Sequence, residues 1–255
     1  MTAPVPFRSI VGAGGLHLTG WMMTSHAEIA REVVAGGFDS LTFDLQHGLA
    51  GVENLSVAIA AAGVPALVRV PQGDTASISR VLDMGASAVI VPMVNSVAEA
   101  RAAVAFAKYP PRGGRSWGPM RGIGAGAMAP RAYLSAANDL TALFVMIETR
   151  AALEACEDIL AVDGVDGVLV GPSDLSISLT GGDTVDPDHA LVSDALDRVL
   201  AAAAAHDRMT AIYANDAAAA RAFAARGFRI VAIATDLGYV RAGASALVAA
   251  TRAKG

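Results

Sequence analysis

Short apolar runs alternate with longer alanine-rich segments of helical period along the chain, and this alternation restricts the fold more than any other feature. The short runs are rich in Val, Ile and Leu and lack a polar residue at every second position, which is typical of parallel strands covered by helices on both faces. We predict eight strands, at His17–Met22, Ser40–Leu45, Ala66–Val70, Ala88–Pro92, Ala142–Ile147, Gly167–Val170, Thr210–Tyr213 and Ile230–Ala234. A helix is predicted after each strand, at His26–Ala35, Val52–Ala62, Thr75–Met84, Val97–Lys108, Ala151–Leu160, Ala190–Ala205, Asp216–Arg226 and Leu237–Arg252.

Eight strand–helix units in 255 residues match the usual size of a (β/α)8 barrel. We therefore predict an α/β fold, with one (β/α)8 TIM barrel domain over residues 1–255. A doubly wound sheet normally has a glycine-rich turn after its first strand, whereas residues 22–26 read Met-Met-Thr-Ser-His. Glycines follow several predicted helices, where a left-handed cap favours this residue: Gly36, Gly63, Gly85, Gly164 and Gly227.

The one long connection between predicted elements covers residues 109–139 and is rich in Gly, Pro and Arg. A loop of this length in a compact domain is usually functional, and we predict a lid or an oligomer contact. Its Gly122-x-Gly124-x-Gly126 pattern is not a dinucleotide-binding fingerprint, because the spacing differs and no strand directly precedes it.

Charge and composition exclude several classes of partner. The formal net charge of −5 argues against binding to nucleic acid or to an anionic membrane surface, because both need a basic surface. No apolar run approaches the roughly 18 residues that span a bilayer. The single Cys156 cannot form an intramolecular disulfide, and residues 1–15 lack the pattern of a secretory signal, so we expect a cytoplasmic protein.

In a (β/α)8 barrel the reactive residues lie at the carboxyl ends of the strands. The second predicted strand ends in Asp44-Leu45-Gln46-His47, the third in Arg69, the fifth in Glu148, and the sixth is followed by Gly171-Pro172-Ser173-Asp174. We therefore expect a histidine, an arginine and two acids to meet at one end of the barrel.

Two carboxylates without clustered His or Cys suit Mg²⁺ or Mn²⁺. If Glu148 and Asp174 hold such an ion, its open positions can take the carboxylate and keto oxygens of a 2-oxo acid, and the ion acts as a Lewis acid. Arg69 would then neutralise charge on the enolate oxygen, and His47 would act as general acid and base, because imidazole exchanges protons near neutral pH. Alternatively, the two acids cap helices or pair with Arg69 and Arg150.

Two further polar residues at the second strand end remain open. Asp44 can act directly in catalysis or serve as a structural acid at the end of a strand, and the structural role is the commoner one. Gln46 either lines the cavity or forms hydrogen bonds with the backbone.

The motifs at these strand ends resemble the HpcH/HpaI aldolase family, and the likeness extends from about Trp21 to Asp236. It rests on Phe43-Asp44-Leu45-Gln46-His47-Gly48, Val68-Arg69-Val70-Pro71, Val81-Leu82-Asp83-Met84-Gly85, Val91-Pro92-Met93-Val94, Tyr109-Pro110-Pro111-Arg112-Gly113, Ile147-Glu148-Thr149 and Gly171-Pro172-Ser173-Asp174-Leu175-Ser176. The resemblance implies a metal-dependent class II aldolase that acts on pyruvate or hydroxypyruvate and an aldehyde. The implied cofactor is a divalent cation, Mg²⁺ or Mn²⁺ first, with Co²⁺ or Zn²⁺ as alternatives.

The resemblance also assigns roles to individual residues. Glu148 and Asp174 would bind the metal, His47 would be the acid and base, and Arg69 would stabilise the enolate. The expected substrate contacts are Trp21, Gln46, Arg69 and the backbone around Gly171, Pro172 and Ser173. The chain departs from many pyruvate aldolases of the family in reading Met146-Ile147-Glu148 for Gln-Ile-Glu, and Leu45-Gln46-His47 for Gly-Glu-His.

A further acid, Asp83, matches the family position that raises the basicity of the histidine. The predicted topology places Asp83 at the end of the third helix, on the opposite side of the barrel from His47. The role therefore requires contact across a subunit interface. Members of the family are typically homohexamers, trimers of dimers that exchange a C-terminal helix, which makes such a contact feasible.

Three other functions are compatible with parts of the sequence to different degrees. A Schiff-base aldolase needs a lysine in the cavity, but Lys108 and Lys254, the two lysines of the chain, lie outside the predicted strand ends. A relative of the citrate lyase β subunit that cleaves a 3-hydroxyacyl-CoA would need basic residues for the CoA phosphates, and Arg112, Arg115 and Arg121 are the candidates. A non-catalytic barrel that binds metal and keto acid is disfavoured by the intact set of His, Arg, Glu and Asp.

Overall fold

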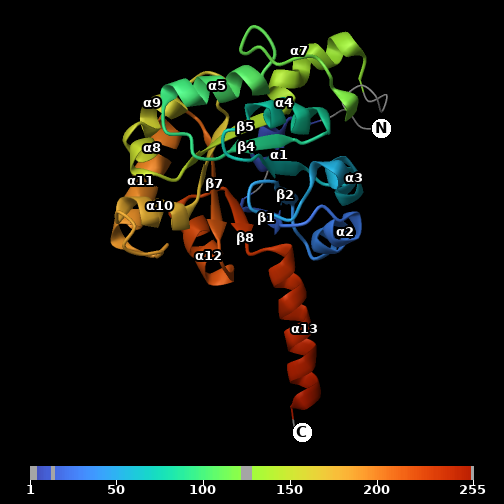
Figure 1. Ribbon diagram of the computed structural model, residues 1–255, viewed down its shortest axis with the longest axis vertical. Coiled ribbons are helices and arrows are strands. Elements are labelled where there is room, and N and C mark those ends of the chain that lie inside the picture. Colours follow the sequence, from blue (N-terminus) through green and yellow to red (C-terminus); the bar gives the residue numbers. More distant parts are fainter. Residues whose placement is uncertain (1–4, 13–14, 122–127, 254–255) are drawn as a thin grey trace.

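The protein folds into a closed barrel of eight parallel strands that neighbour each other in chain order (Figure 1). The computed structural model describes residues 5–12, 15–121 and 128–253. The strands are β1 (His17–Met22), β2 (Ser40–Asp44), β3 (Ala66–Arg69), β4 (Ala88–Val91), β5 (Ala142–Ile147), β6 (Gly167–Val170), β7 (Met209–Ala214) and β8 (Ile230–Ile233). All eight predicted strands are present, so the predicted (β/α)8 barrel is confirmed.

Helices surround the barrel in the order expected from the alternation in the sequence. They are α1 (Phe7–Gly12), α2 (Ala27–Ala35), α3 (Val52–Ala62), α4 (Thr75–Asp83), α5 (Val97–Ala107), α7 (Pro130–Leu140), α8 (Arg150–Glu154), α9 (Cys156–Leu160), α10 (Pro172–Leu179), α11 (Ala190–Ala205), α12 (Ala217–Arg226) and α13 (Asp236–Arg252). Among the described residues, no helix is both long enough and apolar enough to cross a membrane.

Both faces of the strands are buried, which explains why the strands read as unbroken apolar runs. Val68 and Val145 belong to a large cluster formed with the surrounding helices. Their neighbours Leu67, Phe144 and Met146 belong to a second cluster that fills the barrel. Successive side chains of a strand point to opposite faces, so each strand contributes to both clusters.

The structure corrects several local predictions. The predicted helix Ala151–Leu160 is two short helices, α8 and α9, which meet at Ala155. Helices α1, α7 and α10 were not predicted, because each is short or follows a segment rich in Gly and Pro. Gly36 has a φ of −70°, and it is Gly37, with a φ of 104°, that takes the left-handed conformation after α2. The other four predicted cap glycines do have positive φ.

The N-terminal helix α1 covers the amino end of the barrel. Phe7 is fully buried and packs edge-on against the rings of His17 and Phe144. Arg8 forms an ion pair with Asp207, whose carboxylate lies 3.0 Å from Nη1. This end of the barrel is therefore filled by protein.

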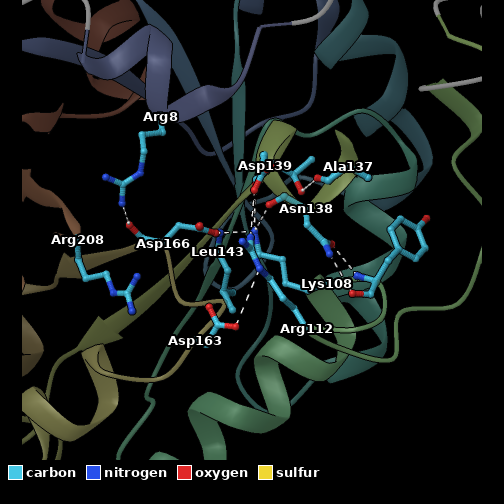
Figure 2. Close-up of polar contacts among 12 residues, drawn as sticks. Arg8, Lys108, Arg112, Ala137, Asn138, Asp139, Leu143, Asp163, Asp166 and Arg208 are labelled. Carbon is cyan, nitrogen blue, oxygen red and sulfur yellow. Dashed lines mark hydrogen bonds and ion pairs between the residues drawn. The ribbon is translucent and has the colours of Figure 1, made fainter. Parts of the chain in front are cut away.

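The described part of the long connection also lies at the amino end of the barrel (Figure 2). The fully buried Lys108 donates from Nζ to the carbonyls of Asn138 and Thr141, each at 2.8 Å, and pairs with Asp166 at 2.6 Å. Asp166 and Thr141 directly precede β6 and β5. The described part of the connection is thus tied to the amino ends of these strands, and its role as a lid or an oligomer contact stays a prediction. Residues 122–127, with the Gly122-x-Gly124-x-Gly126 pattern, lie outside the described residues.

The last helix, α13, extends away from the barrel (Figure 1). Its first turn contacts β1, whereas every residue from 240 to 252 is exposed. Three of the exposed side chains are large and apolar: Val240, Leu247 and Val248.

Candidate active site

A cavity of about 250 Å³ lies at the carboxyl end of the barrel. Residues from seven of the strands or their following loops line it: Trp21, Met23, Asp44, His47, Arg69, Met146, Glu148, Leu169, Gly171, Pro172, Ser173, Asp174, Tyr213 and Thr235. The expected meeting of His47, Arg69, Glu148 and Asp174 at one end of the barrel is therefore confirmed.

Arg69 is fixed in the cavity by a bidentate ion pair with Asp44. The two residues face each other in the register of β2 and β3, and Nε and Nη2 of Arg69 lie 2.9 and 2.7 Å from the two carboxylate oxygens. Asp44 is fully buried and also accepts hydrogen bonds from the backbone N–H groups of Gln46 and His47 and from Trp21 Nε1. Burial alone would raise the pKa of Asp44, but the hydrogen bonds and charge of Arg69 hold it below its ordinary value.

Asp44 therefore positions three residues that line the cavity, Trp21, His47 and Arg69, through hydrogen bonds. It orients the guanidinium of Arg69, whose carbon Cζ lies 4.9 Å from the centre of the Trp21 ring. It also holds the turn that carries His47, which is an exposed residue on the cavity wall. Gln46 does not line the cavity, and its Oε1 is buried without a hydrogen-bond partner in the described part of the chain.

Glu148 follows β5 and is 2% exposed. Its Oε2 accepts a hydrogen bond from the Met93 N–H at 3.0 Å. Burial raises the pKa of Glu148 from 4.5 to about 7, and the charge of Asp174 acts in the same direction, while the Met93 N–H opposes the rise. A buried carboxylate beside a second carboxylate favours either a proton or a cation between them.

The backbone that supports Glu148 is held in an unusual conformation. Met93 has a φ of 56°, in the left-handed region that costs free energy for a residue with a side chain. Asn95 donates from Nδ2 to the Met93 carbonyl at 2.8 Å, and its Oδ1 accepts from the hydroxyl of Thr149. Asn95 thus joins the loop after β4 to the residue after Glu148, a role that no motif in the sequence indicates.

Asp174 lies in the first turn of α10, which begins at the cavity wall. Gly171 precedes the helix, and a Cβ there would lie 2.5 Å from Oε1 of Glu148, so any other residue would displace this carboxylate. Pro172 occupies the first turn, where its missing N–H is not needed. The free N–H groups of this first turn, those of Ser173 and Asp174, make the helix start suitable for an anionic group.

Glu148 and Asp174 fit a divalent cation of the hard class. Oxygen ligands are those that Mg²⁺ and Mn²⁺ prefer, and burial raises the pKa of Glu148, so a cation beside this carboxylate would stabilise its charged form. Among the described residues, no group of three or more His, Cys, Asp or Glu side chains is placed to hold a metal. The protein would thus supply two side-chain ligands, and the other positions would be open to substrate and water.

Comparison with known proteins identifies the family of this chain. The family model HpcH/HpaI aldolase/citrate lyase matches residues 18–242. The chain belongs to this family. It is 36% identical to the hydroxypyruvate/pyruvate aldolase of Rhizorhabdus wittichii over 92% of this chain and 94% of the relative. It is 34% identical to the 4-hydroxy-2-oxo-heptane-1,7-dioate aldolase of Salmonella arizonae over 95% of this chain and 93% of the relative. A crystal structure of an HpcH/HpaI aldolase from Desulfitobacterium hafniense covers 98% of both chains, with a TM-score of 0.85 and 28% identity.

The family acid Asp83 lies away from this cavity in the single chain. It ends α4, and helices that follow a strand of a barrel end near the amino side. Its carboxylate pairs with the buried Arg115 at 2.6 Å. Asp83 does not line the cavity that His47 lines, and contact with a histidine through a second subunit stays a prediction.

The arginines expected to bind CoA phosphates in a citrate lyase β-like reaction also lie elsewhere. Arg112 pairs with Asp139 near the amino end of the barrel, and Arg121 donates to the carbonyl of Ser56. Arg115, paired with Asp83, is equally remote from the cavity, so none of the three is placed to bind CoA phosphates there. Lys108 is buried at the amino end of the barrel and does not line the cavity, as predicted. Lys254 lies outside the described residues.

Several residues of the cavity were missed from the sequence. Tyr213 on β7 packs edge-on against Trp21, with 5.4 Å between the ring centres. Met23, Leu169 and Thr235 complete the lining. They lie at or just beyond strand ends, but their residue types carry no chemical signal of their own. Only their position at the carboxyl end would have identified them.

Proposed function

We propose that this HpcH/HpaI family member is a class II aldolase, a carbon–carbon lyase that cleaves and forms a bond between pyruvate or hydroxypyruvate and an aldehyde. The observation that supports this most strongly is the single cavity in which His47, the Arg69–Asp44 pair and the carboxylates Glu148 and Asp174 meet. The relatives named above as aldolases of such substrates support the same assignment.

The metal ligands in this proposal are Glu148 and Asp174. A bound Mg²⁺ or Mn²⁺, or Co²⁺ or Zn²⁺ in their place, would supply Lewis acidity that draws electrons from the keto oxygen of the substrate. Trp21, Met146 and Leu169 form a neutral part of the cavity wall, so the strong side-chain anchors for the substrate among the lining residues, all of which the structure describes, are the charged groups.

The remaining groups of the chain bind substrate and move protons. The start of α10 at Gly171, Pro172 and Ser173 receives the substrate carboxylate, with backbone N–H groups as donors. Arg69 presents its guanidinium to the enolate oxygen, and Asp44 keeps that guanidinium in place. His47 takes up the proton of the 4-hydroxyl when the bond is cleaved and returns it when the bond forms.

A homo-oligomer is part of the proposal. The exposed apolar residues of α13 support packing on another copy of the chain, and the role proposed for Asp83 would require a neighbouring subunit. We expect a hexamer built as a trimer of dimers, with α13 exchanged, in the cytoplasm, without nucleic acid or membrane as a partner.

Two alternatives are less well supported. A citrate lyase β-like cleavage of a 3-hydroxyacyl-CoA lacks its expected basic residues, because Arg112, Arg115 and Arg121 do not line the cavity. A non-catalytic barrel would have no need for an arginine held by two hydrogen bonds in the same cavity as a histidine.

The proposed reaction is tested by cleavage of a 4-hydroxy-2-oxo acid, with pyruvate release measured by a coupled dehydrogenase. Dialysis against a chelator should abolish cleavage, and Mg²⁺ or Mn²⁺ should restore it. Cleavage that is indifferent to chelator but is inactivated by borohydride in the presence of substrate would refute the metal-dependent reaction.

A further inference from the structure

A second cavity, of about 110 Å³, adjoins the first at the carboxyl end of the barrel. Its lining residues are Pro172, Ser173, Pro187, Asp188, Tyr213, Asn215, Asp216, Ala219 and Phe223. Three of them, Pro172, Ser173 and Tyr213, line the first cavity as well. The two cavities therefore share the wall that these three residues form.

The second cavity carries negative charge. Asp188 and Asp216 contribute carboxylates, and none of its lining residues, all within the described part of the chain, is an arginine or a lysine. Asp216 caps α12 through Oδ1, which accepts from the N–H groups of Ala218 and Ala219 at 2.8 and 2.9 Å. In the first cavity, the charge of Arg69 is already compensated by Asp44.

The remaining lining residues suit a short polar carbon chain. Pro187, Ala219 and Phe223 offer apolar surface, while Asn215 and Ser173 offer hydrogen-bonding groups. Burial raises the pKa of Tyr213, so its phenol keeps its proton near neutral pH and can donate a hydrogen bond.

We propose that this second cavity is the subsite for the aldehyde, and that it selects short, uncharged hydroxyaldehydes over aldehydes that carry a carboxylate or phosphate. The inference rests on the aldol reaction proposed above. In that reaction the enolate carbon forms a bond to the aldehyde carbon, and the aldehyde oxygen takes a proton and becomes the hydroxyl. The rest of the aldehyde must then extend away from the 2-oxo acid, and the adjoining cavity is the space that receives it.

The test compares aldehydes matched in skeleton and different in charge or hydroxylation. Succinic semialdehyde and its methyl ester differ in one negative charge, and propanal and glyceraldehyde differ in hydroxyl groups. We measure kcat/KM for addition to pyruvate with the metal-loaded full chain at low ionic strength. The wild type should favour the ester over the acid and glyceraldehyde over propanal.

The variant Asp188→Asn/Asp216→Asn removes both charges, and asparagine retains the capping ability of Asp216. It should raise the kcat/KM of the acid relative to that of the ester by about three- to tenfold. In the wild type, added salt should reduce the discrimination against the acid, because it screens the repulsion from the two aspartates. The control Asp158→Asn removes an exposed charge on α9, which does not line either cavity, and should leave this ratio unchanged.

Exchange of the pyruvate methyl protons with solvent needs no aldehyde and separates this inference from the proposed reaction. All variants should retain the wild-type exchange rate. Two results with normal exchange would overturn the aldehyde subsite alone. One is an unaltered ratio of the kcat/KM values for acid and ester in the double variant, and the other is a rise of this ratio in Asp158→Asn as large as in the double variant. Absence of exchange in the metal-loaded wild type would overturn the aldolase reaction and the subsite with it.

Discussion

Replacing Glu148 by glutamine should inactivate the enzyme and at the same time stabilise the metal-free protein. Burial raises the pKa of Glu148 from 4.5 to about 7, so the folded protein binds a proton more tightly than the unfolded chain. The stabilisation from this group is complete below pH 4.5 and is lost as the pH rises to about 7. At about 1.4 kcal/mol per pH unit, the loss amounts to about 3 kcal/mol.

Glu148→Gln removes the charge and keeps an oxygen that can accept from the Met93 N–H. We therefore expect the variant to be about 2 to 3 kcal/mol more stable than the metal-free wild type at pH 8, or about 4 to 10 °C in Tm for a chain of this size. At pH 4.5 or below, where the wild-type carboxyl is protonated, the difference should largely disappear.

The assay is thermal unfolding of chelator-treated wild type and variant at pH 8 and at pH 4.5. The control Glu154→Gln changes an exposed glutamate on α8 and should shift Tm by less than 2 °C at either pH. A Glu148→Gln variant that is less stable than wild type at pH 8, or equally shifted at both values, would refute the account of this carboxylate.

Three further changes test the surroundings of the cavity. Arg69→Lys loses the two-point pair with Asp44 and should lower kcat about 100-fold or more without unfolding, whereas near-normal turnover would contradict a role for the guanidinium. Asn95→Ala should weaken Mn²⁺ binding about tenfold in calorimetry, because the loop that supports Glu148 loses the hydrogen bond from Asn95 to the Met93 carbonyl. Unchanged affinity would show that this hydrogen bond does not support the metal site. Lys108→Met leaves a partly buried aspartate unpaired and should cost about 3 to 5 kcal/mol in urea unfolding, so a loss below about 1 kcal/mol would show that the pair is dispensable.

The barrel and its reactive end were predictable because they follow from local patterns. Apolar runs such as Ala142–Ile147 mark strands buried on both faces, and parallel strands bring residues like Glu148 and Asp174 to one end of the barrel. The pairing of Asp44 with Arg69 was not predicted, but the register of β2 and β3 in the structure explains it.

The features that escaped prediction depend on contacts between distant segments. The left-handed Met93 is not glycine, and its conformation is supported by Asn95, which has no distinctive sequence context. Tyr213 faces the cavity only because of the side of β7 on which it lies. The helix α7 lies in a connection whose Gly and Pro content indicated a loop, and its burial of Tyr133 needed the folded barrel.

The central claim is that His47 exchanges protons with a 2-oxo acid activated in this cavity. Its most direct test is deuterium exchange into the methyl group of pyruvate, followed by proton NMR in D2O with Mn²⁺-loaded enzyme separated from the substrate before the spectrum is taken. The wild type should exchange these protons, and His47→Ala should lose exchange while it binds Mn²⁺ with wild-type affinity. Wild-type exchange in His47→Ala would contradict the claim.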